Sequence, residues 1–112
     1  GIVDNSINKM INLGADNKKI IAYIGPSIKN CCFEIGSEVA TKFPSNFQIN
    51  GDDNRFFMDL QDLTKNLLMR NSISINNIVT SNECTKCNSD KYFSYRKTGS
   101  KSGRMIGVIG LT

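Results

Sequence analysis

Along the first third of the chain, apolar residues first recur at helical spacing and then form a short continuous run. Between residues 3 and 13 they recur at helical spacing, and Gly14 follows as a stop signal, so we expect a helix there. The apolar run 20–24 predicts a short strand covered on both faces, because no polar residue interrupts it. Gly25 and Pro26 end that strand, since proline has no N–H to donate to a sheet.

A second strand and a second helix are predicted immediately afterwards. Phe33 and Ile35 stand two residues apart and would share one face of a strand. Ser37 has the position of a helix N-cap, and Glu38 places negative charge in the first turn, where the helix dipole favours it. We therefore expect a helix over residues 37–43.

The middle and the end of the chain contain the clearest helix and two further strands. Polar, turn-forming residues over 45–54 predict an exposed loop. Asp59 is placed as the N-cap of a helix whose apolar stripe is formed by Leu60, Leu63, Leu67 and Leu68. Strands are predicted at 78–79 and 105–111. This order of elements predicts an α+β fold, with mixed α/β layers, in a single domain over residues 1–112.

The composition is that of an ordinary globular protein. Hydrophobic residues make up 39% and charged residues 21% of the chain, which argues against disorder. No apolar run approaches the roughly 20 residues that a membrane span requires, and the start has no signal-like segment. We expect a cytoplasmic protein that does not engage a membrane and whose four cysteines are reduced.

The formal net charge of +4 is concentrated at the end of the chain. Residues 1–83 carry eight basic and nine acidic groups, whereas residues 84–112 carry six basic groups and a single acidic one, Asp90. Such an excess attracts anions. We expect a phosphate-bearing small molecule near the last third, in preference to nucleic acid.

The four cysteines are the first candidates for chemistry. Cys84 and Cys87 form a C-x-x-C pair, whereas Cys31 and Cys32 are adjacent and would make an awkward second half of a zinc site. A thioredoxin-like redox pair would need a helix start directly after Cys87, where the sequence reads Asn-Ser-Asp. The chain contains no histidine, on which catalytic zinc and copper sites usually draw. We favour free thiols and expect no metal ligands, with a structural zinc and a redox pair as alternatives.

A basic and aromatic cluster near the end is the second candidate. Its members Ser94, Tyr95, Arg96 and Arg104 are our candidate substrate- and phosphate-binding residues. Guanidinium groups hold phosphate through paired hydrogen bonds, a hydroxyl adds another, and an aromatic ring stacks on a base. The structural alternative places Phe93 and Tyr95 in the core and pairs Arg96 with a carboxylate such as Glu34 or Asp59. The sequence assigns no catalytic residue.

Several motifs resemble those of one known family. They are IGPSI-x-x-CCFEIG-x-EV over 24–39, MDL at 58–60, Asn66, Cys84-Thr85, YFSYRK over 92–97 and GRM at 103–105. In order and spacing this set resembles the second half of the YfiH-type laccase-domain family. Its members are also called multi-copper polyphenol oxidoreductases and are described as purine nucleoside phosphorylases. The resemblance covers essentially all of the chain.

The resemblance implies that the chain is the C-terminal half of a larger domain. It implies a metal-dependent purine nucleoside phosphorylase or adenosine deaminase, formerly assigned to polyphenol oxidation, with zinc or copper in the full-length family. The family's metal ligands, two His and one Cys, lie in VHG, ADC-x-P and HAGWRG segments that precede the position matching Gly1. None of them maps onto this chain, which we therefore expect to be inactive alone.

The same resemblance names the expected partners. They are a purine nucleoside, phosphate and the missing N-terminal half of the domain. Two alternatives stay open: a basic nucleic-acid-binding module, which would rest on the charge of the tail, and the product of a split or decayed gene.

Overall fold

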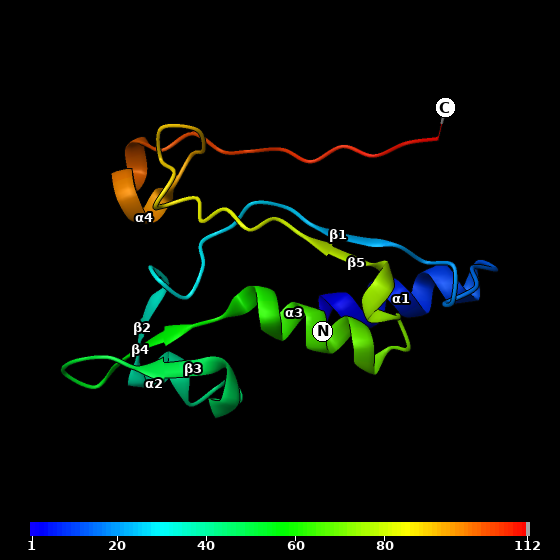
Figure 1. Cartoon of the computed structure of the whole chain (residues 1–112), viewed down its shortest axis with the longest axis horizontal. Coiled ribbons are helices and arrows are strands. Elements are labelled where there is room, and N and C mark those ends of the chain that lie inside the picture. The colour runs from blue at the N-terminus through cyan, green and yellow to red at the C-terminus, as the bar shows by residue number, and fades with distance from the viewer. Residues whose placement is uncertain (112) are drawn as a thin grey trace.

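The computed structural model describes residues 1–111 of the chain. Its helices and strands are α1 (Ile2–Asn12), β1 (Ala22–Ile24), β2 (Glu34–Gly36), α2 (Ser37–Ala40), β3 (Gln48–Asn50), β4 (Arg55–Met58), α3 (Leu60–Arg70), β5 (Ile78–Thr80) and α4 (Tyr95–Thr98), with 3₁₀ turns at 45–47, 75–77 and 99–101. The strands form a parallel pair, β1 with β5, and an antiparallel sheet in the order β2-β4-β3 (Figure 1). The expected mixture of helices and sheets is confirmed.

One hydrophobic core lies between α1, α3 and the parallel pair. Its buried residues are Ile7, Ile20, Leu68 and Ile73, with half-buried side chains of α1, β1 and β5 packed around them. Asp4 at the start of α1 accepts a hydrogen bond from Asn71 Nδ2 at 2.6 Å, which fixes the end of α3 against α1. The predicted first helix and its stop are confirmed, and Gly14 has the positive φ of 102° that a glycine adopts most readily.

A second core lies between the antiparallel sheet and α2. Ile35, Ala40 and the fully buried Met58 form its centre, and Leu60 and Leu63 of α3 pack against it. Helix α3 therefore contributes one end to each core and joins the two halves of the molecule. Its start is the one predicted, because the Asp59 carboxylate accepts a hydrogen bond from the backbone N–H of Asp62 at 2.9 Å.

The region expected to be a loop after the second helix contains a hairpin instead. Residues 48–50 and 55–58 pair as β3 and β4, joined by a turn in which Asp53 and Asn54 take left-handed φ values of 52° and 55°. The polar sequence of β3 concealed the strand. Helix α2 is also shorter than expected and has Gly36, not Ser37, as its N-cap. Its end is fixed by Gln48, whose Nε2 donates to three backbone carbonyls, those of residues 40, 43 and 44.

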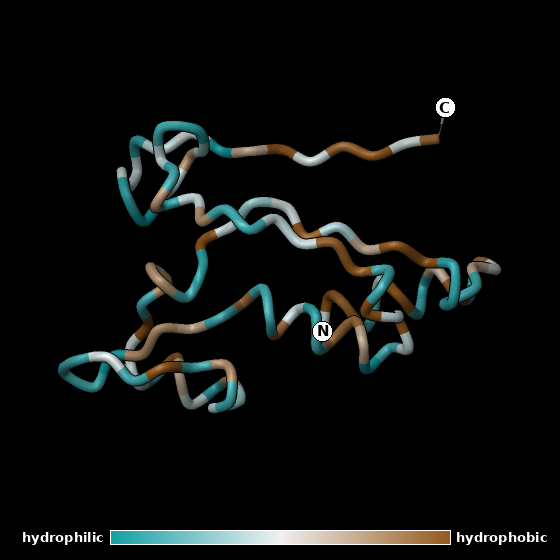
Figure 2. Tube along the Cα trace, viewed as in Figure 1, coloured by the Kyte–Doolittle hydropathy of each residue, from teal (hydrophilic) through white to brown (hydrophobic). Residues whose placement is uncertain are grey.

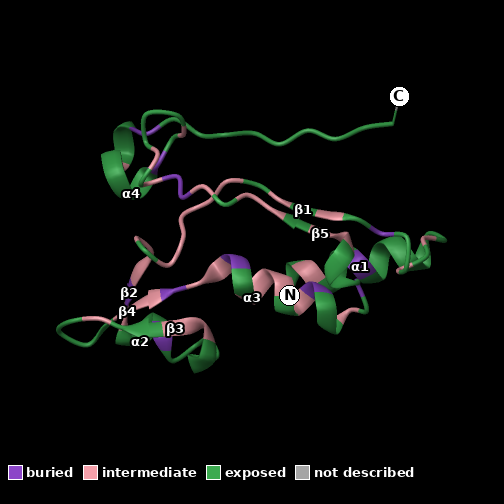
Figure 3. Cartoon of the chain, viewed as in Figure 1, coloured by how far each residue is buried: buried purple, intermediate pink, exposed green. Residues whose placement is uncertain are grey.

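Two apolar segments that were expected inside the protein lie at its surface. In β1 the side chain of Tyr23 is 71% exposed, so this strand is not covered on both faces. Residues 105–111 were expected to form a strand but run as an unpaired, extended segment that is apolar and exposed along its length (Figures 2 and 3). A strand requires a neighbour to accept its hydrogen bonds, and no other described segment pairs with this one.

The dimensions of the chain agree with this exposure. A compact monomer of 12.4 kDa would expose about 6,100 Å², whereas this one exposes 8195 Å². The radius of gyration is 15.8 Å, compared with about 13 Å for a compact domain of this length. Within residues 1–111, no helix is both long and apolar enough to cross a membrane.

Candidate functional site

The parallel strands bring two distant segments together at their carboxyl ends. Beyond β1 and β5 the two chains continue side by side: Ser27 forms a parallel bridge with Cys84, and the N–H of Thr85 donates to the carbonyl of Ser27 at 3.1 Å. The turn that Gly25 and Pro26 begin is thereby placed next to the loop that follows β5. All the candidate residues lie in or beside these two segments.

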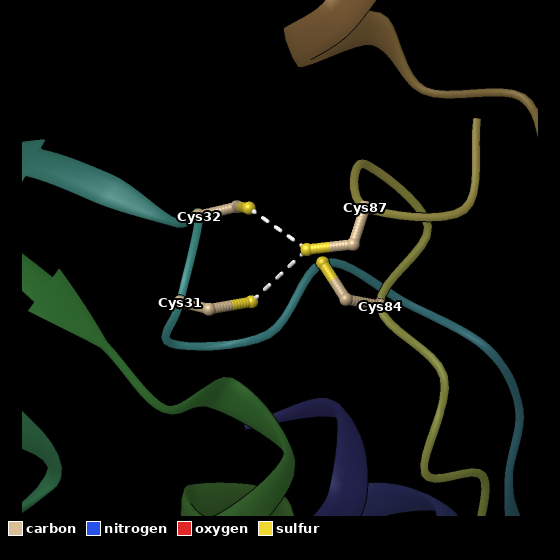
Figure 4. A group of neighbouring side chains, drawn as sticks. All are labelled: Cys31, Cys32, Cys84 and Cys87. Carbon is tan, nitrogen blue, oxygen red and sulfur yellow. Dashed lines mark hydrogen bonds between the residues drawn. The ribbon is translucent and has the colours of Figure 1, made fainter.

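The four cysteines meet where these segments touch. All four sulfur atoms lie within 4.8 Å of one another, with Cys87 Sγ at 3.5 Å from that of Cys31 and 3.4 Å from that of Cys32 (Figure 4). Cys84 is buried, Cys32 is half-buried, and the other two are exposed. Contrary to expectation, the adjacent Cys31 and Cys32 both reach the cluster, because residues 30–32 form a turn, in which neighbouring side chains need not point in opposite directions.

Backbone hydrogen bonds fix the Cys84 side of this cluster. The N–H of Asn88 donates to the carbonyl of Cys84 at 2.9 Å and closes a turn around the C-x-x-C pair, and Asn88 Nδ2 donates to the same carbonyl at 2.8 Å. From the other segment, the N–H of Lys29 donates to Cys84 Sγ at 3.4 Å. The thiol of Cys84 is thus held by both segments.

These contacts divide the thiols into two electrostatic classes. Burial raises the pKa of Cys84, but backbone N–H groups, those of Cys87 and Lys29 foremost, outweigh it and lower the pKa to about 6. Burial, together with hydrogen bonding to neighbouring thiols, raises the pKa of Cys31 to about 12 and also raises that of Cys32. The backbone N–H groups therefore favour the thiolate form of Cys84, and the neighbouring thiols of Cys31 and Cys32 themselves favour the protonated form.

The candidate residues of the basic cluster begin beside the thiols. Ser94 is buried and precedes α4, and its carbonyl accepts the N–H groups of Lys97 and Thr98. Tyr95 is 61% exposed, and Phe93 is also exposed, so the structural alternative that placed these rings in the core is wrong. The tyrosine ring faces the surface, as a stacking residue must.

Arg96 crosses from α4 to the first segment. Its Nη1 donates to the backbone carbonyl of Glu34, and its guanidinium lies 4.8 Å from the centre of the Phe33 ring. The Glu34 carboxylate is instead paired with Arg55 Nε at 2.8 Å, so the expected side-chain pair between Arg96 and Glu34 does not form. An arginine has five N–H donors, and Arg96 therefore keeps capacity for an anion.

Arg104 is held close to the same helix. Its guanidinium lies 5.8 Å from the centre of the Tyr95 ring, and its Nη1 donates to the carbonyl of Ser102. The neighbouring Gly103 lies close to another ring, because a Cβ there would be 2.7 Å from the ring of Phe93. Ser94, Tyr95, Arg96 and Arg104 therefore belong to one region, and the sequence analysis missed Phe33, which supports Arg96 and follows the cysteine pair directly.

Comparison with known proteins places this arrangement in a family. The whole chain, residues 1–112, matches the family described as multi-copper polyphenol oxidoreductase laccase. It is 34% identical over 119 residues to purine nucleoside phosphorylase LACC1 of Mus musculus, covering 99% of this chain and 28% of the relative. It is 32% identical over 110 residues to adenosine deaminase RL5 of an unknown prokaryotic organism, covering 92% and 42% of the two chains.

A solved structure agrees with these sequence relatives. The crystal structure of YfiH from Bacillus licheniformis superposes with a TM-score of 0.81 at 25% identity, over 88% of this chain and 40% of the other. The chain spans less than half the length of each of these three proteins. The resemblance and the fold expected from the sequence are confirmed, and the chain belongs to the multi-copper polyphenol oxidoreductase laccase family.

Proposed function

We propose that this chain supplies the phosphate- and nucleoside-binding part of a purine nucleoside phosphorylase, with adenosine deamination as a related activity. The observation that carries the proposal is that two arginines lie against aromatic rings: Arg96 is 4.8 Å from the centre of the Phe33 ring, and Arg104 is 5.8 Å from the centre of the ring of the exposed Tyr95. Two arginines that can hold a phosphate and one accessible aromatic ring that can stack on a purine base suit such a substrate. Relatives named as purine nucleoside phosphorylases and an adenosine deaminase support the same substrates.

The proposed reaction makes simple demands on these residues. In phosphorolysis an oxygen of hydrogen phosphate forms a bond to C1′ of the sugar, and the bond from C1′ to the purine breaks. The purine leaves with the bonding electron pair and receives the proton that the phosphate gives up. Arg96 and Arg104 would hold the phosphate dianion and offset its charge, and Tyr95 would hold the base at the distance that attack requires.

The residues of this chain do not fit a copper centre held by histidine. Catalytic copper(II) sites draw on imidazole, and the sequence contains no histidine. We therefore assign no step of the reaction to a copper ion held by this chain. The zinc or copper of the full-length family would be bound by residues of further polypeptide, which we propose as the partner of this chain.

Two observations support such a partner. The chain spans less than half the length of its relatives, and it exposes about a third more surface than a compact monomer of its mass would. The apolar segment 105–111 and Tyr23 of β1 are the surfaces that we propose it covers, which would complete the domain. Four free thiols suit a reducing compartment, and we place the protein in the cytoplasm on that basis.

The test is the kinetics of the chain joined to the polypeptide encoded before it. We expect turnover of inosine or guanosine that requires phosphate. Arg96→Ala should raise KM for phosphate roughly tenfold or more, because a charged hydrogen-bond donor is lost. The matched control is Lys101→Ala, which removes an exposed cation from the neighbouring 3₁₀ turn and should leave KM for phosphate unchanged.

Two results would contradict the proposal. One is an absence of phosphate-dependent turnover with every purine nucleoside. The other is an equal response to Arg96→Ala and Lys101→Ala, which would mean that general charge, as in nucleic-acid binding, accounts for the basic tail. Nucleic-acid binding is the weaker candidate because Arg96 and Arg104 are held against Phe33 and Tyr95 by specific contacts.

A further inference from the structure

We propose that Cys31, Cys32, Cys84 and Cys87 form a zinc site that fastens the two segments of the candidate site together. The site would be structural, with four thiolate ligands and no open position. It is separate from the metal implied by the family description, and its test does not depend on the phosphorylase proposal.

The sulfur positions fit a tetrahedral ion. Zinc–sulfur bonds of about 2.3 Å place the four sulfurs of a tetrahedral site about 3.8 Å apart. Here all four sulfurs lie within 4.8 Å of one another, and Cys87 Sγ is at 3.5 Å and 3.4 Å from two of the others. Movements of less than about 1 Å, within the reach of side-chain rotation, would bring them to the spacing of a zinc site.

The local backbone has the form that such ligands require. Cys84 and Cys87 have the two-residue spacing common in structural zinc sites, and the hydrogen bond from Asn88 N–H to the Cys84 carbonyl closes the turn around them. Cys31 and Cys32 lie in a second turn, closed by the N–H of Cys32 donating to the carbonyl of Lys29 at 3.0 Å. Both turns present their thiols to the same point (Figure 4).

Groups around the cluster would support the ligands. The N–H of Lys29 already donates to Cys84 Sγ at 3.4 Å, the kind of contact that orients a ligand and offsets its charge. Four thiolates and one zinc ion carry a net charge of −2, and Lys29 and Lys86 bring positive charge on the two segments themselves. Cys31 and Cys87 are exposed, which gives a metal ion a way in.

A disulfide accounts less well for the geometry. A disulfide joins one pair of sulfurs at about 2.05 Å, whereas Cys87 is almost equally distant from Cys31 and Cys32. Any single pair would leave two further thiols in the cluster without a role. An ion that all four bind uses every member.

A zinc ion at this position would also order the candidate phosphate site nearby. Phe33 follows Cys32 directly and supports the guanidinium of Arg96, and the C-x-x-C turn leads within a few residues to Ser94. An ion bound by both turns would fix the position of Arg96 relative to Phe33. Zinc would therefore order the candidate phosphate site without taking part in its chemistry.

The test measures metal binding by the 112-residue chain itself. We would prepare it reduced and free of metal, titrate it with Zn²⁺ against a chelator of known affinity, and count alkylated cysteines by mass spectrometry. We expect one zinc per chain, protection of all four thiols in its presence, and, with Co²⁺ in place of zinc, the visible absorption of a tetrahedral thiolate site.

Two single substitutions test the ligands. Cys31→Ser and Cys87→Ser alter exposed residues, and each should weaken zinc binding roughly a hundredfold, because one of four ligands is lost. Ser89→Ala, an exposed change in the loop that carries Cys87, is the matched control and should bind zinc as the unaltered chain does. Circular dichroism with and without zinc reports folding, and folding that requires zinc would also support the site.

Three outcomes would overturn the proposal. The first is a zinc affinity that is the same in both cysteine variants as in the control. The second is that the chain binds no zinc, whether it is folded or unfolded. The third is that Cys87 forms a disulfide in air while zinc does not protect the four thiols from alkylation. Each is independent of catalysis, so failure here leaves the phosphorylase proposal standing.

Discussion

The sulfur atoms of Cys32 and Cys87 lie 3.4 Å apart, although 55 residues separate them in the chain. The contact exists because β1 and β5 run parallel and deliver the segments that follow them to the same place. Arg96 makes a second contact between these segments, through the carbonyl of Glu34 and the ring of Phe33. The cysteine cluster and the basic cluster are therefore two parts of one structural unit.

Tyr95 should contribute to the binding of the nucleoside more than to that of phosphate. If the proposed function holds, Tyr95→Ala in the chain joined to its proposed partner should raise KM for the nucleoside about tenfold, because the stacking of a base on an aromatic ring is lost. Tyr95→Phe keeps the ring and should retain most of the affinity. Initial-rate kinetics with each substrate varied in turn measures both effects, and equal losses in the two variants would assign the role to the hydroxyl group.

Gly103 should accept a side chain only if the ring of Phe93 moves. A Cβ at Gly103 would lie 2.7 Å from Phe93, so Gly103→Ala should displace that ring and cost about 1 kcal/mol of folding free energy, with weaker phosphate binding through Arg104. Gly107→Ala, where nothing lies within 4 Å of the added carbon, is the control. Urea unfolding and phosphate titration measure the two effects. The double variant Gly103→Ala with Phe93→Ala should recover the stability that Gly103→Ala loses. If it does not, the clash with the Phe93 ring is not the cause of that loss.

Met58 should be the most costly methionine to truncate. Its side chain is fully buried at the centre of the second core, and Met58→Ala should lower the free energy of unfolding by about 2–5 kcal/mol. Met69 is 45% exposed, and Met69→Ala should cost under about 1 kcal/mol. Thermal and urea unfolding monitored by circular dichroism compare the two variants. Similar losses would mean that the core around Met58 contributes little.

Asp59 should stabilise α3 as its N-cap. Asp59→Ala removes the acceptor for the N–H of Asp62 and should cost about 1 kcal/mol. Asp59→Asn keeps an acceptor oxygen and should cost a few tenths of a kcal/mol. Asp90→Ala removes an exposed acid from a loop and controls for the change in net charge. If the alanine and asparagine variants were equally unstable, the lost charge and not the cap would be responsible.

The sequence predicted those elements whose signals are local. The helical spacing of the leucines and the cap at Asp59 gave α3 correctly, and Gly14 marked the end of α1. The hairpin of β3 and β4 was missed because two of the three residues of β3 are polar, so the turn-forming residues that follow were interpreted as part of a loop. Residues 105–111 were apolar enough for a strand, but a strand also requires a neighbour to pair with.

The candidate site also has one part that the sequence could predict and one part that it could not. The chemistry of the side chains, together with the motif resemblance, made Ser94, Tyr95, Arg96 and Arg104 the candidate binding residues, and they lie in and around α4. The meeting of the four thiols could not be predicted from their spacing, because it depends on a parallel pairing between strand residues 56 positions apart and on the turn at residues 30–32. The adjacent Cys31 and Cys32, followed directly by Phe33, were the local feature from which this cluster could have been suspected.

The most direct test of the proposed function is the identity of the sugar product. The chain, joined to the polypeptide encoded before it, would be incubated with inosine and isotopically labelled phosphate, and the products separated. We predict hypoxanthine together with a sugar phosphate that carries the label, in amounts that fall with Arg96→Ala and not with Lys101→Ala. Free ribose without label would contradict the account, because it would show that water and not a bound phosphate attacks the nucleoside.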